Sequence, residues 1–194
     1  MRAVPLNRYL VFLSITVSGF ALDLATKRYM FDWLGLPGGR TEPLLGNFLG
    51  FQTRLFLGFQ TSLNEGALFG MGQGMVWVFS LLSIAAGVAI CWYLFVAGAA
   101  RQWVLTVALS GMMAGVLGNL YDRVGLPGLK WDFANRLHES GDPVFAVRDW
   151  ILVKFGSWPW PNFNLADSLL VCGALLLFWH AFFQKGPQDC NTAA

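Results

Sequence analysis

Three aspartates stand at the ends of long apolar segments, where a charged side chain is costly. Asp23 comes near the end of the first apolar segment, Asp122 directly follows the third, and Asp167 comes near the start of the fourth. Ionisable groups at bilayer depth are usually functional, and the relay acids of proton carriers are one example. If the segments cross a membrane in turn, these three ends face the same side, so we expect the carboxylates to converge.

Each of these aspartates also has a structural interpretation. Asp23 precedes Lys27 by one helical turn, which is the spacing of a salt bridge within a helix. Asn164 and Asp167 fit the start of a helix, as its N-cap and as an acid in its first turn. Asp122 is harder to explain in this way, because an acid is disfavoured at the C-terminus of a helix.

The composition indicates a membrane protein. Of 194 residues, 56% are hydrophobic and only 12% are charged, whereas soluble domains have about 25% charged residues. A formal net charge of +2 and the lack of a basic run argue against nucleic acid as a partner. Three cysteines and two histidines form neither a disulfide framework nor a zinc-ligand pattern. We therefore expect no metal and no other cofactor.

Four apolar segments are long enough to cross a bilayer, which takes about 20 residues. They lie at about residues 9–25, 75–100, 103–121 and 163–183. Because backbone groups in lipid must satisfy one another, the segments are expected to be helices. The first could be a cleaved signal peptide, but it lacks a clear cleavage site and three further spans follow. A single all-α membrane domain over residues 1–194 is the simpler prediction.

Two long loops, at about 27–74 and 122–162, join the spans on one side of the membrane, opposite the termini. The repeat FLGFQT, at 48–53 and 56–61, predicts a small β-sheet at the membrane surface in the first loop. The pattern GMMAG at 111–115 predicts close helix packing. Tryptophans beside the apolar segments are expected to anchor at the interface, namely Trp33, Trp131, Trp150, Trp158 and Trp160.

The distribution of basic residues leaves the orientation open. Four lysines and arginines lie on the side of the termini, and the other nine of the 13 lie on the side of the long loops. The four are Arg2, Arg8, Arg101 and Lys185. Taken alone, this count would place the long loops in the cytoplasm, but the positive-inside rule weakens for loops of this length.

Four motifs resemble those of the lipoprotein signal peptidases, the type II signal peptidases of bacteria. They are DLATK at 23–27, NEGALFG at 64–70, GNLYDR at 118–123 and FNLADS at 163–168. Each motif is weak alone, but the four occur in the order of the family and on the corresponding spans. The resemblance covers most of the chain.

The resemblance implies an intramembrane aspartyl endopeptidase of the bacterial inner membrane, surrounded by membrane lipid. Its substrate would be a prolipoprotein whose cysteine already carries diacylglycerol, cleaved just before that cysteine, and globomycin would inhibit it. The termini would be cytoplasmic, with both long loops and the active site on the extracytoplasmic side. Two carboxylates would share one proton, one activating water and the other donating to the scissile carbonyl.

The last motif would supply one member of this catalytic pair, Asp167, and two positions compete for the other. Asp132 lies in LKWDF, soon after the third motif, and Asp149 lies in AVRDWI, shortly before the last. The segment around Asp149 follows the family pattern without interruption, whereas residues 125–143 are turn-rich and hydrophilic, as an inserted loop would be. We therefore favour Asp149, and we expect the insertion to lie beside the site as a lid.

The remaining motif residues are expected to orient the pair or to hold the substrate backbone. They are Asp23, Lys27, Asn64, Gly66, Asn119, Asp122, Arg123, Asn164 and Ala166. A small proton- or ion-coupled carrier is the alternative function, and a structural membrane subunit is a third. The carrier is disfavoured because its relay acids would gather at one face instead of tracing a path across the membrane.

Overall fold

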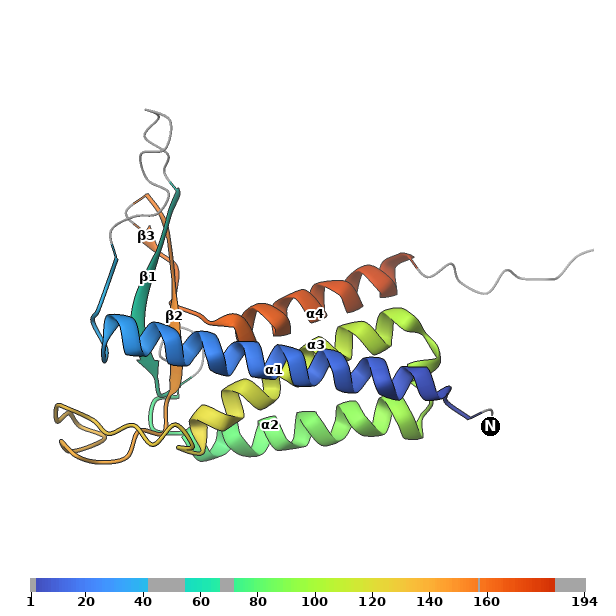
Figure 1. The fold of residues 1–194 in the computed structure, drawn as a ribbon, viewed down its shortest axis with the longest axis horizontal. Coiled ribbons are helices and arrows are strands. Elements are labelled where there is room, and N and C mark those ends of the chain that lie inside the picture. Colours follow the sequence, from blue (N-terminus) through green and yellow to red (C-terminus); the bar gives the residue numbers. More distant parts are fainter. Residues whose placement is uncertain (1–2, 42–54, 67–71, 157, 184–194) are drawn as a thin grey trace, which may run out of the picture.

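The computed structural model describes residues 3–41, 55–66, 72–156 and 158–183. Four helical segments are long and apolar enough to cross a membrane, which confirms the predicted four-span fold. They are α1 (Leu6–Leu34), Val76–Val96, α3 (Trp103–Arg123) and α4 (Leu165–Phe183). The start of α1, the end of α4 and the link between the second and third spans lie at one end of the bundle, and the sheet lies across the other (Figure 1).

Helix α3 forms the centre of the bundle. It packs against α1, α2 (Val76–Cys91) and α4. In the most apolar 18 residues of α3, 67% of the residues are buried. The corresponding share is 22%, 17% and 11% in the first, second and fourth spans. Large apolar side chains such as Leu81 and Leu175 point outward from the other helices. These surfaces suit a lipid surrounding.

Glycines allow the helices to approach α3 closely. A Cβ atom at Gly115 would meet the carbonyl oxygen of Ala166 and lie 2.8 Å from Leu170 Cγ, both on α4. A Cβ atom at Gly173 of α4 would likewise collide with Met112 of α3. The prediction from GMMAG is thus confirmed at Gly115 and wrong at Gly111, where a Cβ atom would meet nothing within 4 Å.

Helix α1 extends well beyond the apolar segment predicted at 9–25. Its 29 residues reach about 43 Å at 1.5 Å per residue, which exceeds the roughly 30 Å thickness of the hydrocarbon core. The charged residues that end the apolar segment do not end the helix, and they form i,i+4 pairs along it. Lys27 Nζ lies 2.8 Å from Asp23 Oδ2, and Arg28 Nε lies 3.5 Å from Asp32 Oδ2.

The second predicted span, at 75–100, is α-helical only from Val76 to Cys91. A π-helical turn, η2 (Trp92–Val96), follows, and a 3-10 turn, η3 (Ala99–Arg101), leads into α3. Gly98 between them has φ 81°, a left-handed conformation that favours glycine. The apolar composition extends through this link although the regular helix does not.

The sheet is built from both long loops, whereas the sequence predicted it in the first loop. Strand β1 (Leu55–Asn64) pairs antiparallel with β2 (Val147–Phe155) of the second loop, and β2 pairs with β3 (Trp158–Pro159). The second copy of the FLGFQT repeat lies in β1. The first copy, at 48–53, lies outside the described residues.

The insertion, residues 125–143, folds over one corner of this end of the molecule (Figure 1). Its centre is Trp131, which is 6% exposed and clusters with Val144 and Ala146, with Leu63 of β1 packed against them. The prediction that Trp131 anchors at the membrane interface is therefore wrong, because its indole fills the interior of the loop.

Replacement of Gly115 by alanine is expected to destabilise the protein by about 1–3 kcal/mol, because the added methyl group forces α3 and α4 apart. The measurement is thermal unfolding of the purified protein in detergent. Gly111→Ala is the matched control on the same helix, and it should leave the unfolding temperature unchanged or raise it. Equal unfolding temperatures for the two variants would contradict this account of the packing.

Candidate active site

A short backbone pairing brings β2 against the start of α4. Ile151 donates its N–H to the carbonyl oxygen of Phe163 at 2.8 Å, and Phe163 donates back to Ile151 at 3.2 Å. Asp149 lies two residues before Ile151 on the same face of the strand, and Asn164 directly follows Phe163. The pairing therefore sets the register in which these two side chains meet.

Asp149 is 1% exposed and accepts a hydrogen bond on each carboxylate oxygen. Asn164 Nδ2 donates to Oδ1 at 2.7 Å, and Asn64 Nδ2 donates to Oδ2 at 3.2 Å. The Asn64 amide is oriented in turn by the N–H of Gly66, which donates to Asn64 Oδ1 at 3.1 Å. Burial, and then the negative charge of Asp167, raise the pKa of Asp149 well above its usual value.

Asp167 and Asn164 form a reciprocal cap at the start of α4. The N–H of Asp167 donates to Asn164 Oδ1 at 2.9 Å, and the N–H of Asn164 donates to Asp167 Oδ2 at 3.2 Å. The structural interpretation of this pair as a helix cap is confirmed. The cap leaves Asp167 Oδ1 for a different partner, Asn119 Nδ2 of α3, at 2.8 Å.

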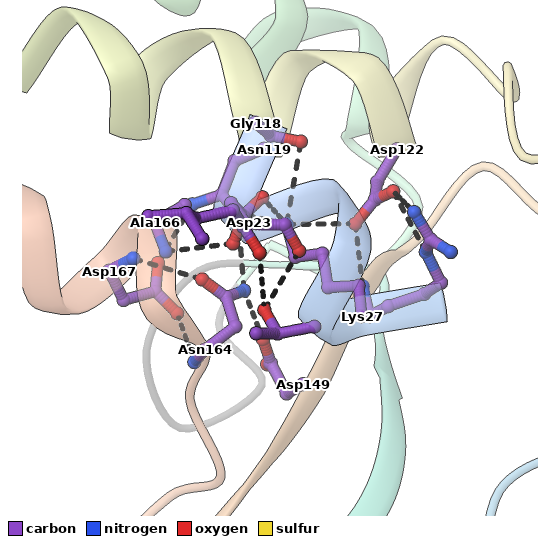
Figure 2. Close-up of polar contacts among 12 residues, drawn as sticks. Asp23, Lys27, Gly118, Asn119, Asp122, Asp149, Asn164, Ala166 and Asp167 are labelled. Carbon is purple, nitrogen blue, oxygen red and sulfur yellow. Dashed lines mark hydrogen bonds and ion pairs between the residues drawn. The ribbon is translucent and has the colours of Figure 1, made fainter. Parts of the chain in front are cut away.

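Asn119 connects the two aspartates to a buried lysine (Figure 2). Its Oδ1 accepts from Lys27 Nζ and from Asn164 Nδ2, both at 3.1 Å. Because an ammonium group can only donate, this oxygen must face Lys27. The Asn119 amide nitrogen consequently faces Asp167.

Lys27 lies between two carboxylates with no exposed surface on any of the three side chains. Its Nζ is 2.8 Å from Asp23 Oδ2 and 3.0 Å from Asp122 Oδ2. Asp122 also receives the Arg148 guanidinium, with Nη2 at 2.8 Å and Nε at 3.0 Å from its Oδ1. Two cations thus balance two anions, which is the condition for burying charge at this depth.

Asp23 also supports the start of α4. Its Oδ1 accepts the N–H of Ala166 at 2.9 Å, which satisfies one of the unpaired donors in the first turn of the helix. Gly118 of α3 makes room for this contact, because a Cβ atom there would collide with Asp23 Oδ2. The expected salt bridge between Asp23 and Lys27 is present as well.

The structure brings the favoured aspartate into this cluster and keeps its competitor apart from it. Asp132 is exposed in the insertion.

Two arginines complete the charged groups near the pair. Arg123 is close enough to feel the charges of Asp167 and Asp149, and its Cζ lies 5.5 Å from the centroid of the Phe79 ring. Arg148 was missed from the sequence. The available signal was that the sequence offered Lys27 as a partner for Asp23 and no comparable partner for Asp122.

A cleft of about 710 Å³ opens at Asp149. One wall is the last part of β1, from Gln60 to Asn64, and the segment from Pro159 to Asn162 forms another. Phe133 of the insertion and Glu65 also line it. The insertion lies beside the site, as predicted.

Comparison with known proteins identifies the family of this chain. The family model described as signal peptidase (SPase) II matches residues 15–183. A lipoprotein signal peptidase of Rhodopirellula baltica is 43% identical over 187 residues, which cover 93% of this chain and 75% of that protein. One of Polynucleobacter necessarius is 31% identical, with 92% of this chain and 91% of that protein covered.

Two solved structures share the fold. A bacterial membrane enzyme structure determined by the in meso method has a TM-score of 0.70 and 25% identity, with 94% of each chain covered. A second with the same description has a TM-score of 0.67 and 26% identity, covering 90% of this chain and 94% of that one. From its motifs, its buried polar cluster and these matches, the chain belongs to the signal peptidase II family.

Proposed function

We propose that this protein is an intramembrane aspartyl endopeptidase that removes the signal peptide from diacylglyceryl-modified prolipoproteins, cutting before the lipidated cysteine. The observation that carries the proposal is the pair of carboxylates, Asp149 and Asp167, that contact one asparagine, Asn164, with Asp149 lining an open cleft. The membership of the signal peptidase II family supports the substrate class.

The environments of the two carboxylates suggest their roles. Asp149 is buried and its pKa is raised, so it holds the shared proton and donates to the scissile carbonyl oxygen. Asp167 lies in the first turn of α4, where the helix N-terminus favours negative charge, and it activates the attacking water. Asn64, Asn119 and Asn164 orient the pair through the hydrogen bonds described above.

The membrane setting follows from the same family. We propose a location in the bacterial inner membrane, with cytoplasmic termini and with the sheet and the cleft on the extracytoplasmic side. A substrate anchored by diacylglycerol then reaches the cleft from the bilayer. Inhibition by globomycin is expected.

The contacts of Asp23 and Asp122 argue against the alternative of a proton- or ion-coupled carrier. Both are held in ion pairs with Lys27 and have no exposed side-chain surface. A relay acid must exchange its proton with water or with a substrate, which these two cannot reach. Transport assays with proteoliposomes should therefore show no proton or ion flux.

Replacement of either Asp149 or Asp167 by asparagine should lower the rate of cleavage of a diacylglyceryl-modified prolipoprotein by about 10²–10⁴-fold or more, because each supplies a proton-transfer step. The measurement is single-turnover cleavage by the purified protein in lipid. Asp132→Asn is the control and should retain full activity, since this side chain lies in the exposed part of the insertion. Loss of activity in Asp132→Asn with retention in Asp149→Asn would reverse the assignment.

The pH profile of kcat/KM should report the shared proton. Activity falls at high pH as Asp149 loses its proton, and the raised pKa moves this fall well above the usual range of a carboxyl group. The Asn64 hydrogen bond lowers the pKa of Asp149, so Asn64→Ala should shift the alkaline limb to higher pH. The same raised pKa means that the folded state binds this proton more tightly than the unfolded state does. The free energy of unfolding therefore declines as the pH rises from the usual pKa of an aspartate to the raised pKa of Asp149. An alkaline limb that Asn64→Ala leaves in place would count against Asp149 as the proton donor.

Lys27→Met should destabilise the protein by about 3–5 kcal/mol, because it leaves two buried carboxylates with a single cation, Arg148. Thermal unfolding in detergent measures this change. Arg28→Met on the same helix is the control, since the Arg28–Asp32 pair has side chains 83% and 72% exposed and contributes little. Similar unfolding temperatures for both variants would show that the buried ion pairs do not stabilise the fold.

A further inference from the structure

A second pocket, of about 330 Å³, lies between the insertion and the start of α2. Three aromatic residues line it, Trp77, Trp131 and Phe145, together with two acidic residues, Glu65 and Asp142. Among the described residues, no lysine or arginine lines this pocket. Its walls therefore combine aromatic surface with negative charge.

His138 lines the same pocket and has unused hydrogen-bonding capacity. Its ring stacks on Trp131, with 3.6 Å between the centroids and an interplanar angle of 6°. The side chain is 5% exposed, and neither ring nitrogen has a hydrogen-bond partner within the part of the chain that the structure describes. Buried polar groups are normally paired, so this imidazole is suited to a ligand.

Glu65 and His138 together define what that ligand must supply. His138 Nε2 lies 4.0 Å from Glu65 Oε1, too far for a direct hydrogen bond. An amine or guanidinium group seated between them can donate one N–H to each. Aromatic faces beside two carboxylates add attraction for a cation.

Glu65 also joins this pocket to the cleft at Asp149. It lines both cavities, and it directly follows Asn64, whose amide donates to Asp149. Because Glu65 is the next residue along from Asn64, a substrate residue at Glu65 lies within a few residues of the bond at the aspartates. The apolar part of a signal peptide stays in the bilayer, so the residues that reach this pocket follow the cleavage point.

We propose that this pocket is a subsite for a lysine or arginine side chain of the substrate, a few residues after the lipidated cysteine. The proposal rests on the proposed function of the cleft. The cationic group donates to Glu65 and to His138, and it lies against the aromatic walls contributed by α2 and the insertion. The insertion thereby gives this enzyme a preference among prolipoproteins.

The test is a series of diacylglyceryl-modified prolipoproteins with Lys, Ala or Glu placed in turn at each of the first few positions after the cysteine. The wild-type enzyme should cleave the Lys substrate about tenfold faster than the Ala substrate, in kcat/KM, at one or two of these positions, and the Glu substrate more slowly. The preference should persist at about 0.5 M salt, because the pocket is partly buried.

Variants locate the preference in the pocket. Glu65→Gln and, independently, Asp142→Asn should bring the Lys-to-Ala ratio close to one, and a ratio measured within each variant cancels any general change in activity. Glu139→Gln, an exposed acid of the same insertion, should keep the wild-type ratio.

Equal kcat/KM for Lys and Ala at every position overturns the proposal while leaving the proposed function intact. A preference spread evenly over all positions and lost in salt also overturns it. Failure of the wild-type enzyme to cleave any member of the series overturns the proposed function, and the subsite with it.

Discussion

The buried ammonium group of Lys27 is the interaction on which the rest of the site depends. It reaches Asp23 on its own helix and both Asp122 and Asn119 on α3. Through these contacts it joins α1 to α3 at the level where the sheet begins. An unpaired charge at this depth would destabilise the fold by several kcal/mol. The two cations, Lys27 and Arg148, are therefore paired with the two anions, Asp23 and Asp122. The polar cluster is consequently held together by contacts within the protein itself.

The direction of each hydrogen bond in the cluster follows from that cation. Lys27 only donates, so Asn119 accepts with its oxygen and donates with its nitrogen to Asp167. Asn164 uses its oxygen for the N–H of Asp167 and its two amide hydrogens for Asn119 and Asp149. Both aspartates therefore receive donors, and the side-chain amides of Asn119 and Asn164 cannot flip without losing these hydrogen bonds. Such an arrangement holds both carboxylates against one asparagine, Asn164.

Structural features that depend on residues close together in the chain could be predicted from the sequence. Contacts between residues far apart in the chain could not. Apolar length and the four motifs predicted the spans and most of the cluster, because helix i,i+4 pairs and helix caps are local. The pairing of β1 with β2 joins residues from different loops, and the sheet was accordingly expected in one loop only. Arg148 was missed for the same reason, since its partner Asp122 lies on α3. The sequence already favoured Asp149 over Asp132 through the uninterrupted family pattern around it, and the structure adds that Asp149 is buried beside Asn164.

The structural and functional interpretations of these aspartates are compatible, and the fold relies on their being so. A helix that starts at the membrane surface leaves unpaired N–H groups in its first turn. Here Asn164 and Asp167 cap those groups reciprocally, and Asp23 accepts one more from Ala166. The N–H of Asn164 donates to Asp167, which stabilises the negative charge that the proposed mechanism needs on one member of its pair. A carboxylate in the first turn of α4 thus satisfies the backbone and the chemistry with the same contacts, which explains how a charged group can be kept at the edge of an apolar helix without destabilising it.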